Sequence, residues 1–335
     1  MATGAADPTP TVQAWTAVTA CLRASRRVLL VLHVRPDGDS IGCSLAVARG
    51  LRAIGKQAVV VSPDAIPANL TFLDPDCECV PPAEAAGPFD VALFLDCADL
   101  DRIGGAAKLL DAIPTVVNID HHRSNGCYGT LNYVDPDAAA CGEIALRLCD
   151  ALGVGLDARG ATALFAALAT DTGGFRYGAT TAVTLAMASR LRAAGADLAL
   201  VGHEVWDSRS LGSLRLLAVA LNSLGVDADG ELAWVSLQSS DLASGADPGD
   251  SEGLVDYPRS LRGVEVAALF AADQPGRVRV SLRSNRRVDV SRLAQAFGGG
   301  GHARAAGCSV DGDLETVRAR VLAAARAALQ PEGAS

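Results

Sequence analysis

Residues 28–40 read VLLVLHVRPDGDS, and this stretch decides the fold. Its first five residues form a short, continuous apolar run, which is typical of a strand buried on both faces of a parallel sheet. His33, Asp37 and Asp39 follow this run closely. Because ligand sites form beyond the carboxyl ends of parallel strands, the stretch predicts a buried strand that ends in a functional site.

Similar apolar runs in the first half of the chain predict further strands of the same sheet. They occupy residues 58–61, 91–95 and 115–119. Segments with helical spacing accompany them, at residues 11–26, 40–54, 139–152, 158–169 and 181–194. Buried strands separated by helices indicate an α/β fold in which a parallel sheet is covered on both faces.

The second half of the chain has a different pattern, which predicts a second, smaller α/β domain. Strand-like segments lie at residues 232–237, 264–270 and 277–282, with a loop rich in Gly, Asp, Ser and Pro near 244–253 and a closing helix at 314–329. Two domains also suit the chain length. We expect a catalytic domain at 15–195, a helical linker at 196–225 and a substrate-binding domain at 226–330, with the boundary within 195–210.

The composition narrows the classes of function. The chain has 335 residues, of which 50% are hydrophobic, so it can bury a large core. Its net charge of −9 argues against long nucleic acid as a partner, because such binding depends on a surplus of basic residues. Short oligonucleotides and nucleotides are compatible with this charge.

Other features of the composition bear on the location. Nine scattered cysteines predict reduced thiols rather than a disulfide framework. The apolar runs fall short of the roughly 18 residues of a membrane span, and the first residues do not resemble an export signal. We therefore expect a cytoplasmic protein that does not bind a membrane.

Imidazoles and carboxylates gather at the ends of the predicted strands, and this predicts a metal site. The candidate ligands are His33, Asp37, Asp39, Asp96, His121 and Asp171. Oxygen and imidazole ligands suit Mn²⁺ and related ions, and the lack of cysteine disfavours structural zinc. Two divalent ions, Mn²⁺ first with Mg²⁺ or Co²⁺ as alternatives, could bind a water and a phosphate together.

Two other interpretations of Asp37-Gly38-Asp39 fail on spacing. A calcium-binding loop would need an oxygen ligand where Ile41 stands and a closing glutamate where Ala48 stands. An aspartyl-phosphate nucleophile normally follows its strand at once, whereas Asp37 lies five residues beyond Leu32. Both interpretations are rejected.

In these motifs the sequence resembles the DHH phosphoesterase superfamily. The resemblance rests on His33-x-x-x-Asp37-x-Asp39, Asp96, Asp120-His121-His122 and Asp171. The second half resembles the DHH-associated C-terminal domain of the RecJ type, through Arg283-Ser284 and the run GGGGHARAAG at residues 298–307. The resemblance extends over roughly residues 20–330.

This resemblance implies a role for each site residue. One ion would be held by His33, Asp37 and Asp96, and the second by Asp39, Asp96, His121 and Asp171. Catalytic roles would fall to His122, facing the substrate phosphate, and to Asp120, orienting the imidazoles. The substrate would be bound by Arg283, Ser284, Gly299, Gly300, Gly301 and His302, which places the metal site in a cleft between the domains.

The size and layout resemble the NrnA-like branch of the superfamily. Its members degrade short RNA oligonucleotides to nucleoside 5′-monophosphates and dephosphorylate 3′-phosphoadenosine 5′-phosphate to AMP, and relatives suggest a homodimer. Two alternatives stay open. One is a phosphodiesterase of the same superfamily acting on cyclic di-AMP or pApA, and the other is a catalytically silent nucleotide-binding regulator.

Overall fold

The computed structural model describes residues 10–242, 248–251 and 253–330. The chain divides into two compact units, Met1–Ser208 and Arg209–Ser335, called here the first and the second unit. Residues 244–247 and 252 of the expected loop lie outside the described residues. Within the described part of the chain, no helix is long and apolar enough to cross a membrane.

The first unit is built on a parallel sheet of six strands, which confirms the α/β prediction. The strands are β1 (Arg27–Val31), β2 (Gln57–Val61), β3 (Cys79–Val80), β4 (Val91–Leu95), β5 (Thr115–Asp120) and β6 (Leu131–Val134), in the order β3-β2-β1-β4-β5-β6. All five neighbouring pairs are parallel. The short strands β3 and β6 were not expected from the sequence. They extend the sheet at its two edges.

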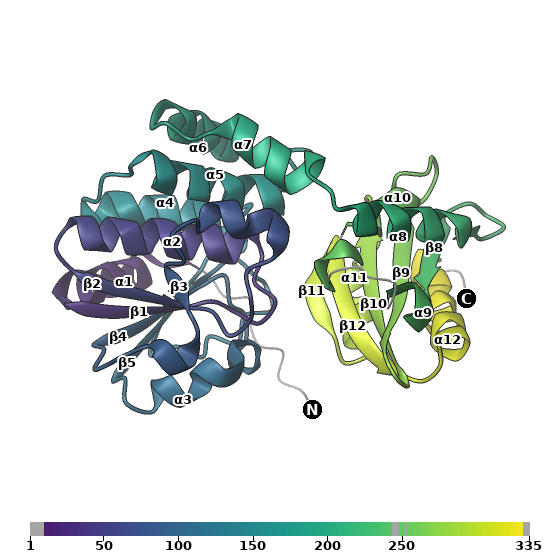
Figure 1. Ribbon diagram of the computed structural model, residues 1–335, viewed down its shortest axis with the longest axis horizontal. Coiled ribbons are helices and arrows are strands. Elements are labelled where there is room, and N and C mark those ends of the chain that lie inside the picture. The colour runs from purple at the N-terminus through teal and green to yellow at the C-terminus, as the bar shows by residue number, and fades with distance from the viewer. Residues whose placement is uncertain (1–9, 243–247, 252, 331–335) are drawn as a thin grey trace. The chain divides into compact units, whose positions relative to one another are not determined.

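Helices cover the faces of this sheet unequally (Figure 1). One face carries α1 (Val12–Ala24), α2 (Gly38–Ala53), α4 (Cys141–Leu152) and α5 (Ala158–Asp171), with α6 (Ala182–Ala193) and α7 (Leu198–Gly202) further out. The other face carries the 3-10 helix η3 (Leu100–Ala106) and the short α3 (Ala107–Leu110). In β1, Leu30 packs into the core on the first face and Leu29 into the core on the second. Burial on both sides explains why the run lacks polar alternation.

Helices α2 and α5 approach each other closely through residues without bulky side chains. A Cβ atom on Gly38 would lie 2.6 Å from Thr170 Cγ2, and one on Gly42 would lie 2.3 Å from the Ala163 carbonyl oxygen. These glycines are one turn apart and face α5. The close packing brings the start of α2 beside the end of α5, which is where Asp39 and Asp171 stand.

The second unit contains a mixed sheet of six strands. The strands are β7 (Gly225–Val226), β8 (Leu232–Leu237), β9 (Val266–Gln274), β10 (Arg277–Ser284), β11 (Gly300–His302) and β12 (Ala305–Asp311), in the order β11-β12-β10-β9-β8-β7. Only β8 and β9 pair in parallel among the described strands of this sheet. This unit is the second α/β domain that the sequence pattern predicted.

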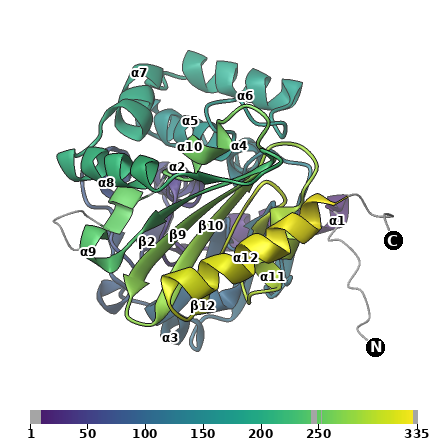
Figure 2. The same cartoon turned by 90° about the vertical axis from the view of Figure 1, so that its right-hand side faces the viewer.

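Helices pack on both faces of the second sheet. One face is covered by α11 (Val290–Gln295) and α12 (Leu314–Leu329), and Figure 2 shows α12 running across the strands. The other face is covered by α8 (Leu211–Asn222) and α10 (Asp256–Arg259), with the short α9 (Ser239–Leu242) beside β9. Helix α8 falls in the stretch expected as a linker. Its Leu216 packs in one core with Val235 of β8, within the second unit.

Replacement of Gly42 by valine should separate α2 from α5. The new side chain would meet backbone atoms of Ala163, which cannot rotate away, and overpacking of this kind costs about 1–3 kcal/mol. Urea unfolding of Gly42→Val should show that loss. Gly155→Val is the matched control, because a Cβ at Gly155 meets nothing within 4 Å. Equal stabilities of the two variants would contradict the role given to Gly42.

Candidate metal centre

The first unit places each predicted metal ligand at the end of a strand or helix. His33 follows β1, Asp96 follows β4, and His121 follows β5. Asp37 is the N-cap of α2, with Oδ1 accepting a hydrogen bond from the Ser40 amide at 3.0 Å. Asp39 lies in the first turn of α2, and Asp171 is the last residue of α5.

One group of ligand atoms comes from His33, Asp37 and Asp96, and these atoms all lie within 4.8 Å of one another. His33 Nε2 is 3.5 Å from Asp37 Oδ2 and 3.7 Å from Asp96 Oδ2. Both distances exceed those of good hydrogen bonds. Among the described residues, none provides a hydrogen-bond partner for His33 Nε2 or Asp96 Oδ1, although both atoms are buried. Buried polar atoms without partners are costly, and a cation would satisfy them.

A second group comes from Asp39, His121 and Asp171, again within 4.8 Å. His121 Nε2 lies 3.8 Å from Asp39 Oδ2 and 3.2 Å from Asp171 Oδ2. It also lies 3.4 Å from Asp96 Oδ1. Asp96 therefore contacts both groups, and the φ angle of 63° at this residue is a backbone conformation that non-glycine residues rarely adopt. The donor set fits divalent metal ions.

Backbone groups orient these ligands. Asp39 accepts hydrogen bonds from the amides of Cys141, at 2.6 Å, and Gly142, at 2.9 Å. Both amides belong to the first turn of α4, so a helix N-terminus holds this carboxylate. The Nδ1 atoms of His33 and His121 lie 2.9 Å and 3.1 Å from the carbonyls of Val34 and Ala138. A histidine that donates from Nδ1 to a carbonyl presents its Nε2 lone pair to a metal.

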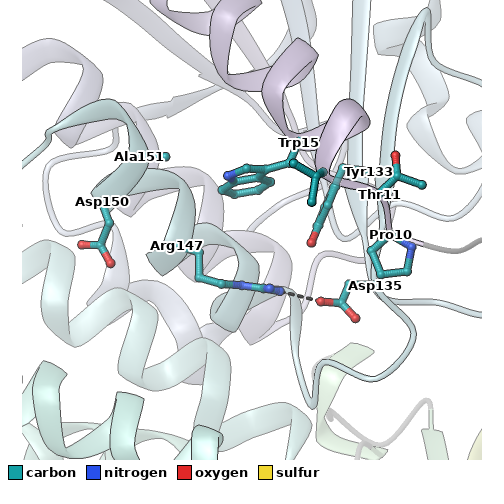
Figure 3. Close-up of a pocket in the computed structure, with 9 residues that line it drawn as sticks. Pro10, Thr11, Trp15, Tyr133, Asp135, Arg147, Asp150 and Ala151 are labelled. Atoms are coloured by element: carbon teal, nitrogen blue, oxygen red, sulfur yellow. Dashed lines mark hydrogen bonds and ion pairs between the residues drawn. The ribbon is translucent and has the colours of Figure 1, made fainter.

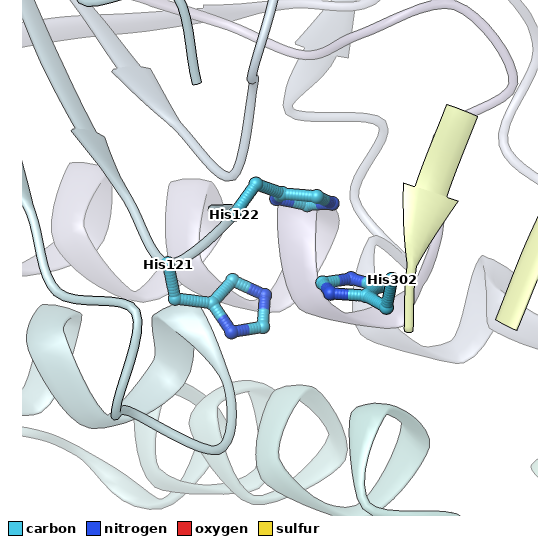
Figure 4. Close-up of side chains that lie close together, drawn as sticks. All are labelled: His121, His122 and His302. Atoms are coloured by element: carbon cyan, nitrogen blue, oxygen red, sulfur yellow. The ribbon is translucent and has the colours of Figure 1, made fainter. Parts of the chain in front are cut away.

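Asp120 and His122 form a pair beside the metal ligands. Asp120 Oδ1 lies 2.8 Å from His122 Nδ1 and accepts a hydrogen bond from the His121 amide at 2.7 Å. Its Oδ2 accepts a hydrogen bond from Asn125. Figure 4 shows the imidazoles of His121 and His122, whose ring centroids are 5.0 Å apart. Asp120 is fully buried and committed to these neighbours, so its geometry suits orientation of the loop.

Sequence reasoning missed the groups that support this site. Asn125 lies five residues after Asp120 in a polar loop, and nothing in that pattern separates it from an ordinary turn residue. The amides of Cys141 and Gly142 leave no trace in the sequence at all. Arg102, whose Nη2 lies 2.9 Å from His33 Nδ1, also lacked a recognisable signal.

The charges of the cluster shift several pKa values upwards. Burial and the carboxylates of Asp96 and Asp37 raise the pKa of Asp171 to about 7. Burial, Asp96 and Asp171 raise the pKa of Asp39 well above its ordinary value. Burial opposes protonation of His33, but the charge of Asp37 and the nearby carboxylates of Asp37 and Asp96 raise its pKa to about 10. Asp39, Asp171 and His33 thus bind protons more tightly when the cluster lacks other cations.

The second unit places the predicted substrate-binding residues on neighbouring strands. Arg283 of β10 and His302 of β11 both pair with Ala305 of β12, so the three side chains share one face of the sheet. Ser284 is buried, and its hydroxyl donates to the Val288 carbonyl at 2.6 Å. This hydrogen bond commits the Ser284 hydroxyl to its own unit.

The glycines at β11 differ in whether the structure leaves room for a side chain. A Cβ atom on Gly299 would lie 2.1 Å from the Gly307 carbonyl oxygen, and one on Gly301 would lie 2.5 Å from the Ala305 carbonyl oxygen. Packing against β12 therefore excludes side chains at both positions. A Cβ on Gly300 would meet nothing within 4 Å. Among these three, only the backbone of Gly300 lies open on its Cβ side.

The first unit also has a pocket of about 660 Å³ that shares no residue with the metal ligands (Figure 3). It is lined by Pro10, Thr11, Val12, Trp15, Tyr133, Asp135, Arg147, Asp150 and Ala151. The rings of Trp15 and Tyr133 lie 4.8 Å apart, and Arg147 pairs with Asp135 at 2.6 Å. With its arginine paired to a carboxylate, this pocket offers no comparable set of metal ligands.

Comparison with known proteins places the chain in a family. The model described as "DHH family, N-terminal domain" matches residues 27–172, and that described as "DHHA1 domain" matches residues 234–330. A Thermus thermophilus protein named "Bifunctional oligoribonuclease and PAP phosphatase NrnA" is 34% identical over 310 residues, which are 91% of each chain. The chain belongs to the DHH phosphoesterase superfamily. This DHH protein is therefore a hydrolase, and the resemblance seen in its motifs is confirmed.

A solved structure and a second relative are also similar to the DHH protein. The crystal structure of an exopolyphosphatase-related protein from Bacteroides fragilis has a TM-score of 0.85 and 26% identity, covering 96% of each chain. The "Cyclic-di-AMP phosphodiesterase GdpP" of Geobacillus thermodenitrificans is 26% identical over 83% of this chain but only 44% of its own length. The chain thus has the fold of the family, and its relatives include proteins that are named for different substrates.

The raised pKa values predict how metal ions stabilise the protein. A group whose folded pKa is raised contributes stability that is lost as pH rises through that pKa. For Asp171 the window runs from its ordinary 3.8 to about 7, and for His33 from 6.5 to about 10. The melting temperature in EDTA should fall between pH 6 and 9, and the gap to the Mn²⁺-loaded protein should widen.

Differential scanning fluorimetry at several pH values measures this gap. The variant Asp171→Asn removes one of the repelling carboxylates, so in EDTA at pH 8 it should melt above the wild type. A gap that is constant or narrows as pH rises would contradict the electrostatic account.

Proposed function

We propose that this DHH protein is a metal-dependent phosphoesterase acting on short RNA oligonucleotides and on 3′-phosphoadenosine 5′-phosphate. The products would be nucleoside 5′-monophosphates and AMP, respectively. The observation that carries the proposal is the pair of His/Asp groups, built around buried histidines, that share Asp96. The 34% identity to a relative named for these two activities selects the substrates.

The proposed cofactors are two divalent ions, most suitably Mn²⁺, with Mg²⁺ or Co²⁺ as alternatives. His33, Asp37 and Asp96 would hold one ion, and Asp39, Asp96, His121 and Asp171 the other. Ions bound there would supply positive charge for the scissile phosphate and lower the pKa of a coordinated water. The protein's part is to keep seven ligand contacts in place with the supporting hydrogen bonds described above.

His122 and Asp120 are the proposed catalytic residues of the protein itself. Burial opposes protonation of His122, but the charge and hydrogen bond of Asp120 raise its pKa. An imidazolium held by Asp120 at Nδ1 can donate from Nε2 to a phosphate oxygen. That donation would offset the negative charge that builds during displacement at phosphorus.

Residues of the second unit are the proposed contacts to the substrate. Arg283 and His302, on one face of the sheet, are suited to a terminal phosphate. The open backbone of Gly300 is suited to close approach of an anion, with Gly299 and Gly301 shaping the strand around it. Ser284, whose buried hydroxyl donates to the Val288 carbonyl, would act in this set by fixing the strand end that carries Arg283.

Short substrates suit the charge of the chain. A net charge of −9 repels a long polyanion, whereas a dimer or trimer brings few phosphates. We place the activity in the cytoplasm, with support from the nine cysteines, all of which are free thiols. The Geobacillus relative supports a second candidate, a cyclic di-AMP phosphodiesterase, with pApA as the alternative substrate of the same candidate. A silent nucleotide-binding regulator is disfavoured by the complete set of ligands.

Turnover assays with Mn²⁺ test the proposed function. RNA dimers, RNA trimers and 3′-phosphoadenosine 5′-phosphate should be consumed, while long RNA and cyclic di-AMP persist. Asp96→Asn should lower turnover by about 10²–10³-fold, because loss of a metal ligand removes several kcal/mol of charge stabilisation. The exposed Asp111→Asn is the matched control and should retain wild-type rates.

The substrate panel separates the candidates. Cyclic di-AMP as the fastest substrate would replace the first candidate by the second. Equal rates on long and short RNA would contradict the preference for short substrates. Absence of turnover on every substrate would leave only the regulator.

A homodimer belongs to the same proposal, and α8 supports it. Leu211, Leu214 and Leu221 lie on one side of this helix and are 63%, 49% and 43% exposed. An exposed apolar stripe of this kind is suited to burial between two copies of the chain. Light scattering should give twice the chain mass of 34.2 kDa, and Leu214→Ser with Leu221→Ser should give the monomer. A monomeric wild type would refute the dimer.

A further inference from the structure

Arg102 reaches into the metal centre from a segment that the motifs do not include. It lies in η3, the 3-10 helix that follows Asp96 along the chain. Its carbonyl accepts a hydrogen bond from the Val34 amide at 2.6 Å, and its Nη2 lies 2.9 Å from His33 Nδ1. The loop after β4 is thereby tied to the loop after β1, at the first group of metal ligands.

The charge of Arg102 lacks a carboxylate of its own. Among the described residues, no carboxylate oxygen lies within ion-pair distance, 4.0 Å, of its guanidinium. Several other arginines of the first unit are paired with carboxylates. Arg49 contacts Glu78 at 2.6 Å, Arg147 contacts Asp135 at 2.6 Å and Arg159 contacts Asp76 at 2.6 Å. A half-buried guanidinium beside a metal centre, without such a partner, suits an anion that is not part of the chain.

Hydrogen-bond donors and acceptors at His33 limit what Arg102 can do when a metal is bound. A neutral imidazole carries one proton. If Nε2 coordinates a metal, that proton is on Nδ1, and the Val34 carbonyl at 2.9 Å is placed to accept it. Nη2 of Arg102 is also a donor, so it cannot keep a hydrogen bond to Nδ1. With a metal ion at Nε2, the guanidinium would therefore be without its hydrogen bond to His33.

We propose that Arg102 binds the substrate phosphate at the metal centre once a metal ion has displaced it from His33. The ligand class is a phosphate monoester or diester, whose oxygens accept two parallel hydrogen bonds from a guanidinium. This inference rests on the proposed function for the identity of the substrate. It adds a residue to phosphate recognition that lies in the first unit, on the same loop as Asp96.

A purely structural role for Arg102 makes the opposite prediction for metal affinity. If Arg102 serves only to orient His33, its removal should weaken Mn²⁺ binding. If Arg102 instead favours the His33 tautomer that cannot bind a metal through Nε2, and also repels the ion by its charge, its removal should not weaken Mn²⁺ binding. The Mn²⁺ affinity of the variant should then equal or exceed that of the wild type. Removal of Arg102 would then weaken phosphate binding without weakening Mn²⁺ binding.

The experiment compares the wild type with Arg102→Ala, Arg102→Lys and the control Arg159→Ala, which removes an exposed arginine paired with Asp76. Isothermal titration measures the Kd for Mn²⁺ and then the Kd for AMP with the Mn²⁺-loaded protein. In Arg102→Ala we expect Mn²⁺ affinity equal to or above that of the wild type and a 10- to 100-fold weaker AMP affinity, as follows from about 1.5–3 kcal/mol for a charged hydrogen bond. Arg102→Lys should lose less, because it keeps the charge but not the fork.

Two results would overturn the inference. One is an unchanged AMP affinity in Arg102→Ala, and the other is a weaker Mn²⁺ affinity, which would assign Arg102 to orientation of His33. Circular dichroism verifies folding, and Arg102→Lys carries the test if the alanine variant unfolds. A wild type that binds AMP with Mn²⁺ but hydrolyses neither RNA dimers nor 3′-phosphoadenosine 5′-phosphate would refute the proposed function while leaving Arg102 as a phosphate ligand.

Discussion

Mutual repulsion among clustered carboxylates, of which Asp39 and Asp96 are buried, is the constraint on which the rest of the first unit depends. Asp39, Asp96 and Asp171 converge on His121, and Asp37 joins Asp96 at His33. Like charges at such distances oppose each other, most strongly where they are shielded from water, as Asp39 and Asp96 are. Burial and that repulsion together raise the pKa values of Asp39 and Asp171. Cations relieve it, so the feature that destabilises the empty cluster is the same one that gives it affinity for metal.

The fold holds these charges together because moving them apart would disrupt strand pairing and helix packing in the same unit. Strands β1, β4 and β5 are registered side by side, so the residues that follow them cannot drift apart. Close packing at Gly38 and Gly42 fixes α5 against α2. The N-terminus of α4 then offers two amides to Asp39. Stability drawn from the apolar core is thus used to position groups that would repel one another in isolation, as is common at functional sites.

In both units, glycines permit close packing and an arginine lies beside a candidate ligand-binding residue. In the first unit, glycines permit close helix packing and Arg102 lies beside a metal ligand. In the second unit, Gly299 and Gly301 permit close strand packing, while Gly300 is left open and Arg283 shares a face with His302. A run of four glycines is therefore not one uniform flexible loop. Packing excludes a side chain at Gly299 and Gly301, whereas Gly300 has room for one.

The sequence by itself determined the parallel sheet and the residue types of the candidate metal site. Continuous apolar runs identify buried strands because both faces need apolar contacts, and His33, Asp96 and His121 follow those runs directly. The edge strands β3 and β6 were not predicted, because two to four residues are too few to show a recognisable pattern. Only the tertiary structure decided which groups support the ligands. Asp39 is held by amides 102 and 103 positions away, and Arg102 meets His33 across 69 positions. Backbone amides are identical in every residue, so no sequence pattern distinguishes those that a fold will bring to a carboxylate.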